Sequence, residues 1–401
     1  MLAPAPKSIV TALQQLATAV MIGALSLGVA PAAGAADVAA FDIPAILSLT
    51  GNGAFVGKAE QDALTRLQGA VNARGGIQGH PLRLVYYDDQ TNPQVALQLA
   101  NDIMARGGAV VLGPSITAQC LSMMPIIQGK LVEYCLSPAI HPDKGSYAFS
   151  SNVSTKDLVG AFIRYFHARG LNRIAVINTT DATGQDADRN FAEALALPEN
   201  KGVTIVAQEH LAVADLTAAA QLAKIKAANP QVLITWGIGT AFATVIRAVK
   251  DVGLDVPVAT TSANMTFAQM KQYGGFLPKD LYFPGAAYLA GVPASPQQKT
   301  ALDAFAQANK AAGVTPDFAT GTGWDAAVLV IEAFRKLGTG ATAAQIHDYL
   351  ESLHGFPGIT GIYDFRDGSN RGLSDKDVIV MRWDSDRTTW TTVSKYGGLP
   401  L

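Results

Sequence analysis

The chain has 401 residues, of which 49% are hydrophobic and only 15% are charged. This is roughly two or three times the length of a typical single domain, and the apolar fraction allows a sizeable buried core. The formal net charge is −2, and no run of lysine and arginine occurs. These properties argue against nucleic acid and anionic membranes as partners.

The first 36 residues differ in composition from the rest of the chain. Lys7 is their only charged side chain, and the apolar stretch 16–30 is followed by the small residues of "PAAGAAD". This pattern predicts a secretory signal peptide, removed near residue 35 or 36. The alternative is an N-terminal membrane anchor, which the shortness of the stretch disfavours. No later segment is long and apolar enough to span a bilayer, so we expect an exported, soluble protein.

Strand and helix patterns alternate along the first half of the remaining chain. Residues 41–49 alternate between apolar and other side chains, as a strand does, and 58–74 carry a helical apolar stripe that stops at Gly75 and Gly76. The same reasoning predicts strands at 82–89, 109–113 and 130–137, and helices at 93–106 and 117–128.

The second half repeats this rhythm. Strands are predicted at 173–178, 203–210, 231–237 and 256–261, helices at 185–197, 216–228, 240–252 and 318–338, and closing strands within 362–372 and 378–393. Alternating strands and helices indicate an α/β fold with parallel sheets, and two such runs predict two doubly wound lobes. Ligands of such sheets bind beyond the carboxyl ends of the strands. This rule selects the loops 50–57, 88–92, 113–119, 137–143, 178–185, 236–241 and 260–264.

The turn in "VVLGPSITAQC" (110–120) joins an apolar strand to a helix. Gly113 and Pro114 are followed by Ser115 and Thr117. Free backbone N–H groups at a helix N-terminus bind anions. The turn therefore holds a phosphate, a cofactor or a carboxylate, or it only caps its own helix.

The two cysteines, Cys120 and Cys135, leave two interpretations open. In an oxidising compartment they can form a disulfide. Alternatively, both are buried free thiols that fill apolar space. No cysteine–histidine cluster has zinc-site spacing, so no metal is expected.

Motifs for cofactors and for hydrolysis are weak or missing. "GNGAFVG" (51–57) resembles a dinucleotide turn and Asp88–Asp89 end the next strand, but the glycine spacing departs from G-x-G-x-x-G. We interpret them as a flexible loop and a solvated acidic turn. No P-loop and no G-x-S-x-G elbow occurs. His80, His210, His347 and His354 are expected at the surface.

Three further residues lie at predicted strand or helix ends. His141, in "SPAIHPD", follows a strand on the ligand side, where it binds ligand or caps its own loop. Trp236 and Trp324 stand where an apolar ligand could stack, and their alternative role is core packing.

Taken in order, several segments resemble the leucine/isoleucine/valine-binding family of periplasmic receptors for ABC importers. They are "LSLTGNGAFVGKAEQDAL" (47–64), "VNARGGIQGHPLRLVYYDDQTNPQVALQLANDI" (71–103), "VVLGPSITA" (110–118), "LSPAIHP" (136–142), "VIRAVKDVGLDVP" (245–257), "GWDAAVLVIEA" (323–333) and "GITGIYDF" (358–365). The resemblance covers nearly all of the chain after the signal peptide.

The resemblance implies a type I periplasmic binding protein fold without catalysis or cofactor. Lobe 1 would comprise 37–154 and 286–361, and lobe 2 would comprise 155–285 and 362–401, with crossovers near 153–157, 284–288 and 360–364. The lobes would close on a ligand like a hinged clamp. A membrane permease would read the closed form, and we expect a periplasmic monomer.

The resemblance also implies binding residues. Ser115 and Thr117 correspond to the family's carboxylate cradle, which Ile140 and His141 continue. Phe55 and Val56 match an aromatic wall, Ile238 and Gly239 stand beside Trp236 near a family tyrosine, and Trp324 with Asp325 matches a frequent Tyr-Asp pair.

One departure concerns the ligand's amine. By alignment, Ser262 replaces the glutamate with which amino-acid binders of the family hold the ammonium, and a desolvated ammonium needs a counter-charge. The leading hypothesis is therefore a receptor for a small organic acid, plausibly aromatic. Asp181, the remaining acid on the cleft side, keeps an amino-acid or amide ligand open as the second hypothesis. An exported enzyme or a signal receptor with the same lobes is the third.

Overall fold

A computed structural model describes residues 38–401 of the chain. The predicted signal peptide and its cleavage site lie outside the described residues. Among residues 38–401, no helix combines the length and the apolar character that crossing a membrane requires.

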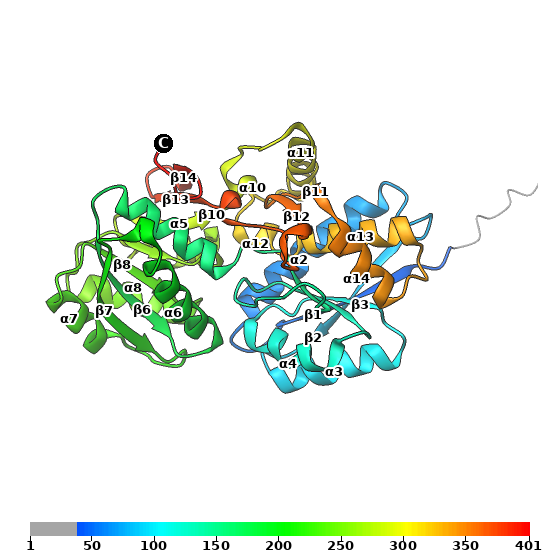
Figure 1. The fold of residues 1–401 in the computed structure, drawn as a ribbon, viewed down its shortest axis with the longest axis horizontal. Helices are drawn as coiled ribbons and strands as arrows, with labels where there is room; N and C mark the ends of the chain where they lie inside the picture. The colour runs from blue at the N-terminus through cyan, green and yellow to red at the C-terminus, as the bar shows by residue number, and fades with distance from the viewer. Residues whose placement is uncertain (1–37) are drawn as a thin grey trace, which may run out of the picture. The chain divides into compact units, whose positions relative to one another are not determined.

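The first sheet is parallel throughout, with five strands in the order β2-β1-β3-β4-β5. Figure 1 labels three of them, β1, β2 and β3. The strands are β1 (Phe41–Leu47), β2 (Leu82–Asp88), β3 (Val110–Leu112), β4 (Val132–Cys135) and β5 (Ala148–Ser150). β3 and β4 are buried along their whole length, as expected for a parallel sheet that is covered on both faces.

Helices connect these strands and cover the sheet. They are α2 (Ala54–Asn72), α3 (Pro93–Ala105) and α4 (Thr117–Ile127), joined later in the chain by α13 (Trp324–Leu337) and α14 (Ala343–Ser352). The Asn92 side chain caps α3 by accepting hydrogen bonds from the N–H groups of Gln94 and Val95. The predicted helix 58–74 begins earlier, at Ala54, because most of the supposed flexible loop "GNGAFVG" forms its first turn.

The second sheet has seven strands in the order β14-β13-β10-β9-β8-β6-β7. β6 (Arg173–Thr179), β7 (Thr204–Leu211), β8 (Val232–Trp236), β9 (Val258–Thr260) and β10 (Leu281–Gly285) are parallel. β13 (Ile379–Asp384) and β14 (Thr389–Tyr396) add antiparallel strands at one edge. Both parallel-dominated sheets confirm the predicted α/β class.

The helices of the second half are shorter on average and include single turns. They are α5 (Thr155–His167), α6 (Ala182–Leu195), α7 (Ala219–Ala227), α8 (Thr240–Asp251) and α9 (Phe267–Tyr273), with short η helices at Pro198–Asn200 and Ser262–Asn264. Strand ends and helix starts of this half therefore meet at the loops 178–185, 236–241 and 260–264. These are loops that the sequence analysis selects, because ligands bind beyond the carboxyl ends of the strands.

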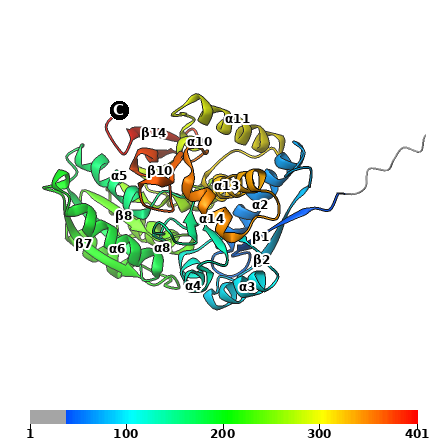
Figure 2. The same ribbon diagram turned by 45° about the vertical axis from the view of Figure 1, so that its right-hand side comes forward.

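After β10 the chain returns to the neighbourhood of the first sheet. It forms α10 (Ala287–Ala290), α11 (Pro296–Ala311), α12 (Phe318–Gly321), α13, α14 and the hairpin β11 (His354–Pro357)–β12 (Ile362–Asp364). Short η helices at Phe365–Asp367 and Asp375–Asp377 precede β13. Figure 2 shows the last strands beside β10, far in sequence from it. The predicted helix 318–338 is interrupted, because Gly323 adopts a left-handed conformation between α12 and α13.

Two expectations about exposure are wrong. Asp89 is fully buried, not part of a solvated turn, because its carboxylate accepts hydrogen bonds from Ser48 and from the Thr91 N–H. His347 is buried as well, since it lies on α14 with its ring stacked on Tyr147 at a centroid distance of 4.5 Å. The assignment of residues to two lobes stays a prediction.

Candidate functional site

A cavity of about 40 Å³ lies where several strand ends and helix starts meet. Its lining comes from segments around the first sheet and from segments around the second sheet, and these two parts are called the first and the second half of the fold. The residues are Val56, Glu60, Ser115, Ile116, Thr117, Leu136, Ser137, Pro138, Thr183, Ile238, Thr261, Ser262, Ala263, Phe318 and Thr322. Seven of these fifteen residues carry a hydroxyl group, but most of the surface that they present to the cavity is apolar.

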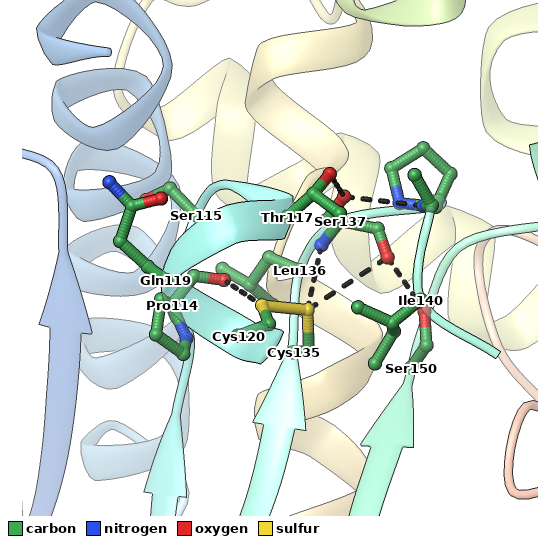
Figure 3. The surroundings of a disulfide bond; sticks show 12 residues. Pro114, Ser115, Thr117, Gln119, Cys120, Cys135, Leu136, Ser137, Ile140 and Ser150 are labelled. Atoms are coloured by element: carbon green, nitrogen blue, oxygen red, sulfur yellow. Dashed lines mark hydrogen bonds between the residues drawn. A yellow bond between two sulfur atoms is a disulfide. The ribbon is translucent and has the colours of Figure 1, made fainter. Parts of the chain in front are cut away.

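The N-terminus of α4 lies at this cavity (Figure 3). The N-cap residue is Ile116, whose side chain cannot accept the first N–H groups of the helix. The first two helical residues are Thr117 and Ala118. An eleven-residue helix that begins without a side-chain cap presents its N–H donors and the positive end of its dipole to whatever lies in front of it. This arrangement suits a carboxylate.

Three hydroxyl groups meet in front of that helix. The Thr117 Oγ lies 2.8 Å from Ser137 Oγ and 3.1 Å from Thr183 Oγ. Thr117 and Ser137 follow β3 and β4 of the first sheet, whereas Thr183 opens α6 beside the second. The cluster is almost fully enclosed at Thr117, which is 1% exposed.

A disulfide joins the two segments that carry this cluster. Cys120 lies in the first turn of α4, and Cys135 ends β4 two residues before Ser137 (Figure 3). The disulfide alternative of the sequence analysis is therefore the one realised. The Ser137 N–H also donates to Cys135 Sγ at 3.3 Å. Together these contacts hold the start of α4 against the loop after β4.

Ile140 packs on the disulfide rather than lining the cavity, and it is fully buried. The backbone around it is held by Arg371, which donates to the carbonyls of Pro138, at 3.1 Å, and of Ile140. Burial lowers the pKa of this guanidinium to about 10. A buried cation bonded to two carbonyls stiffens the loop that supplies Ser137 and Pro138 to the cavity.

Glu60 is the acid of the cavity wall, and it is 1% exposed. Its Oε2 accepts a hydrogen bond from Ser115 Oγ, whereas Oε1 has no hydrogen-bond partner among the described residues. Burial, with a smaller contribution from the nearby Asp89 charge, raises the pKa of the Glu60 carboxyl to about 8. The carboxyl is therefore mainly protonated at neutral pH.

A chain of hydrogen bonds connects Glu60 to Asp89. Ser115 Oγ accepts from the Ser48 N–H at 3.2 Å, and Ser48 Oγ donates to Asp89 Oδ1 at 2.7 Å. Burial also raises the pKa of Asp89. The predicted cradle residue Ser115 is thus engaged with an acid that the sequence analysis did not name.

A second cavity of about 220 Å³ adjoins the first, with Ile116, Thr183 and Ile238 in the walls of both. Asp181 lines this second cavity. Its Oδ1 accepts from Thr179 Oγ at 2.6 Å and from the Gly184 N–H at 3.1 Å, so it caps α6. The hydrogen bonds of Asp181 therefore serve the N-terminus of its own helix.

His141 lies outside both cavities and links the two halves of the fold. Its Nε2 lies 2.6 Å from Oδ1 of Asp186 on α6. Asp186 is buried and also accepts from Arg189 at 3.0 Å. The imidazole is half exposed, so His141 joins α6 to the loop after β4.

The three aromatic residues predicted at the ligand do not line this cavity. Trp236 is fully buried with its ring edge-to-face to Phe191, and Trp324 packs edge-to-face on Phe305. Both thus realise the core-packing alternative, and Trp324 lines a separate cavity beside α11 and α13. The Phe55 ring packs over Gly239 at the mouth of another cavity. The aromatic ring in the wall of the first cavity belongs to Phe318.

Of the predicted site residues, the structure gathers Val56, Ser115, Thr117, Ile238 and Ser262 around one cavity. Among the lining residues that the prediction did not name are Glu60, Ser137, Thr183, Phe318 and Thr322. A signal for Glu60 was available. It stands one helical turn before Ala63 and Leu64 and seven residues before Leu67, so it interrupts the buried stripe of α2 with a carboxyl group.

Comparison with known proteins identifies relatives over most of the chain. Residues 40–388 match a family described as periplasmic binding proteins. A Leu/Ile/Val-binding protein homologue of Brucella melitensis is 24% identical over 375 residues, covering 90% of this chain and 97% of the relative.

Solved structures share the fold at low sequence identity. An extracellular ligand-binding receptor of Rhodopseudomonas palustris has a TM-score of 0.78 at 20% identity, covering 89% of this chain and 99% of its own. The branched-chain amino acid binding protein LivJ of Streptococcus pneumoniae, in complex with isoleucine, has a TM-score of 0.72 at 18% identity, with 88% and 99% covered. A solute-binding protein of an R. palustris ABC transporter, in complex with benzoate, has a TM-score of 0.74 at 16% identity, with 90% and 97% covered.

Proposed function

Because this chain belongs to the periplasmic binding protein family, we propose that it is the extracytoplasmic receptor of an ABC importer for a small organic carboxylate. It binds the solute between the two halves of the fold and delivers it to a membrane permease. It acts as a monomer in the periplasm, without a cofactor and without catalysis.

The observation that carries this proposal is the N-terminus of α4, which has no side-chain cap and lies at the cavity. Its free N–H groups and the Thr117 hydroxyl supply donors to a negative head group. Residues from both halves, among them Ser137 and Thr183, surround the same space. A ligand held there contacts both halves at once, which is what stabilises a closed clamp.

The ligand's body is the finer part of the proposal. Val56, Ile238 and Phe318 give the cavity an apolar side that suits a hydrocarbon group. Relatives of the same fold have been solved with an aromatic acid and with a branched-chain amino acid. We favour a hydrophobic or aromatic acid without an amine, since Ser262 lies in the wall where an acid would be needed on that side.

A thermal-shift and calorimetry panel tests the carboxylate proposal. The probes are benzoate, 4-hydroxybenzoate, 3-methyl-2-oxobutanoate and leucine. We expect stabilisation by a carboxylate, and a ligand at 100 times its Kd adds about 2.7 kcal/mol. No stabilisation by any of these probes would count against the proposal.

Thr117→Val tests the cradle itself. Loss of one hydrogen bond to a charged group predicts about 10- to 100-fold weaker binding of the carboxylate that stabilises the wild type. Thr204→Val, on an exposed position of β7, is the matched control and should bind as the wild type does. If Thr117→Val binds the carboxylate as tightly as the wild type does, Thr117 does not contribute to the binding site.

A further inference from the structure

Glu60 is a buried carboxyl group in the wall of the candidate cavity, and the donors of the proposed carboxylate site do not include it. Glu60 Oε1 has no hydrogen-bond partner among residues 38–401, although the side chain is almost fully enclosed. A buried polar atom without a partner is costly unless something else satisfies it. Because Glu60 lines the cavity, a bound ligand is the natural partner of Oε1.

We propose that Glu60 is a specificity-determining residue, which binds as a neutral carboxylic acid and donates a hydrogen bond from Oε1 to an acceptor oxygen of the ligand's carboxylate. This inference rests on the proposed function and refines its ligand class to carboxylates without an amine at the head group.

The position of the proton follows from the contacts of Glu60. Ser115 Oγ already donates to Oε2, so the acid proton belongs on Oε1, the oxygen that has no partner. No cation is paired with Glu60 among the described residues, and the charge that acts on it is the carboxylate of Asp89. The raised pKa of Glu60 agrees with this neutral state.

The hydrogen bond between Glu60 and Ser115 determines which class of ligand the cavity favours, because it places Glu60 beside the start of α4. Ser115 lies two residues before Thr117, so Glu60 is bonded to the same turn that supplies the N–H donors of α4. An ionised Glu60 would repel a carboxylate bound there, whereas a neutral Glu60 adds a donor to the others. The head-group region then consists of hydrogen-bond donors, which favours an anion over an ammonium.

Other titratable groups lie on the elements packed around this part of α2, and they must be considered in any pH experiment. They are Lys58, Asp62 and Arg66 on α2, Tyr86 and Asp88 on β2, Asp89 after β2, and Asp317 before α12. Of these, Asp89 is joined to Glu60 through Ser48 and Ser115.

The test is the linkage between benzoate binding and protonation, measured by calorimetry from pH 7 to pH 9 in phosphate and in Tris. If Glu60 must be protonated, affinity for benzoate falls about tenfold across this interval, and binding takes up protons at the upper end. Glu60→Gln keeps an N–H donor in place of the acid, so it should bind benzoate with an affinity that no longer changes with pH.

Glu133→Gln is the matched control. Glu133 is also fully buried, and neither of its oxygens has a hydrogen-bond partner among the described residues, but it lies on β4 and lines neither cavity of the candidate site. This variant should keep the pH profile of the wild type. A profile lost in both variants would overturn the assignment to Glu60.

The remaining outcomes separate this inference from the proposed function. Benzoate binding with the same affinity at pH 7 and pH 9 would overturn the role of Glu60 and leave the receptor proposal standing. Leucine binding that releases a proton and is abolished by Glu60→Gln would show that Glu60 accepts from an ammonium, which overturns the inference. Binding of none of the carboxylates in the panel would overturn both.

Discussion

Glu60 shows how one residue sets the chemistry of a cavity. It stands on the buried stripe of α2, where its carboxyl is removed from water and its partner is the Ser115 hydroxyl rather than a cation. Under these conditions the charged form is the costly one. A residue type usually associated with negative charge thereby becomes a hydrogen-bond donor in the wall of the cavity.

This protonation makes stability depend on pH in a defined direction. The folded-state pKa of about 8 lies above the ordinary value of 4.5, so the unfolded chain loses this proton first. The contribution of Glu60 is complete below the ordinary pKa and is lost as pH rises through the folded pKa. Relative to Glu60→Gln, the free energy of unfolding of the wild type should fall by at most about 1.4 kcal/mol per pH unit between pH 5.5 and 7.5.

Urea unfolding at several pH values measures this difference without any ligand. Asp62→Asn, on an exposed position of the same helix, is the control and should follow the wild type. Parallel stability curves for the wild type and Glu60→Gln would mean that Glu60 is charged in the folded protein.

At the level of elements, the candidate site depends on how closely helices start against strand ends. In α2, a Cβ at Gly57 would lie 2.1 Å from the carbonyl oxygen of Ser48, just after β1. In α6, a Cβ at Gly184 would lie 1.8 Å from the carbonyl oxygen of Thr179, at the end of β6. Glycine at both places allows the first turn of each helix to approach the strand end, which brings Glu60 and Thr183 to the cavity.

The disulfide acts at the same scale. It closes a loop over 15 residues of sequence between α4 and β4, and a loop of this length corresponds to about 3 kcal/mol of stabilisation in the chain-entropy treatment. The free energy of unfolding of the double variant Cys120→Ala/Cys135→Ala should therefore be lower by roughly this amount, so the variant should unfold at a lower urea concentration than the wild type.

The same variant should also bind its carboxylate more weakly, since the start of α4 and the loop of Ser137 are then no longer linked. Urea unfolding and calorimetry of the one variant measure both effects. The wild type treated with a reductant is the natural comparison. Unchanged stability and affinity would show that neither the disulfide nor the hydrogen bond from Ser137 N–H to Cys135 is needed to position the start of α4.

For the whole molecule, contacts between the halves decide how firmly a ligand is enclosed. The hydrogen bond of His141 to Asp186 joins the loop after β4 to α6, and the Thr117–Thr183 contact does the same inside the cavity. Such contacts exist only when the halves lie together. Each of these contacts therefore adds its own small free energy to the stability of a closed state.

His141→Ala should weaken carboxylate binding by at most about fivefold, because the imidazole is half exposed and the buried Asp186 keeps its hydrogen bond from Arg189, so the lost contact contributes no more than about 1 kcal/mol. Most of the change is expected in the dissociation rate, measured by stopped-flow fluorescence. His210→Ala is a close control, since His210 pairs with Asp188 at 2.8 Å entirely within the second half and has a similar exposure. Equal effects of both variants would mean that the His141 contact does not act on closure.

The alternation of strands and helices and the ligand side of the sheets could be predicted from the sequence, because apolar periodicity and the strand-end rule are local properties of the chain. The loops selected in this way supply most of the cavity wall, including Thr117 and Ser262. Which polar and aromatic side chains reach the cavity was decided only by tertiary packing. Trp236 is taken up by the core and Glu60 is turned to the cavity because neighbours distant in sequence fill the space around each.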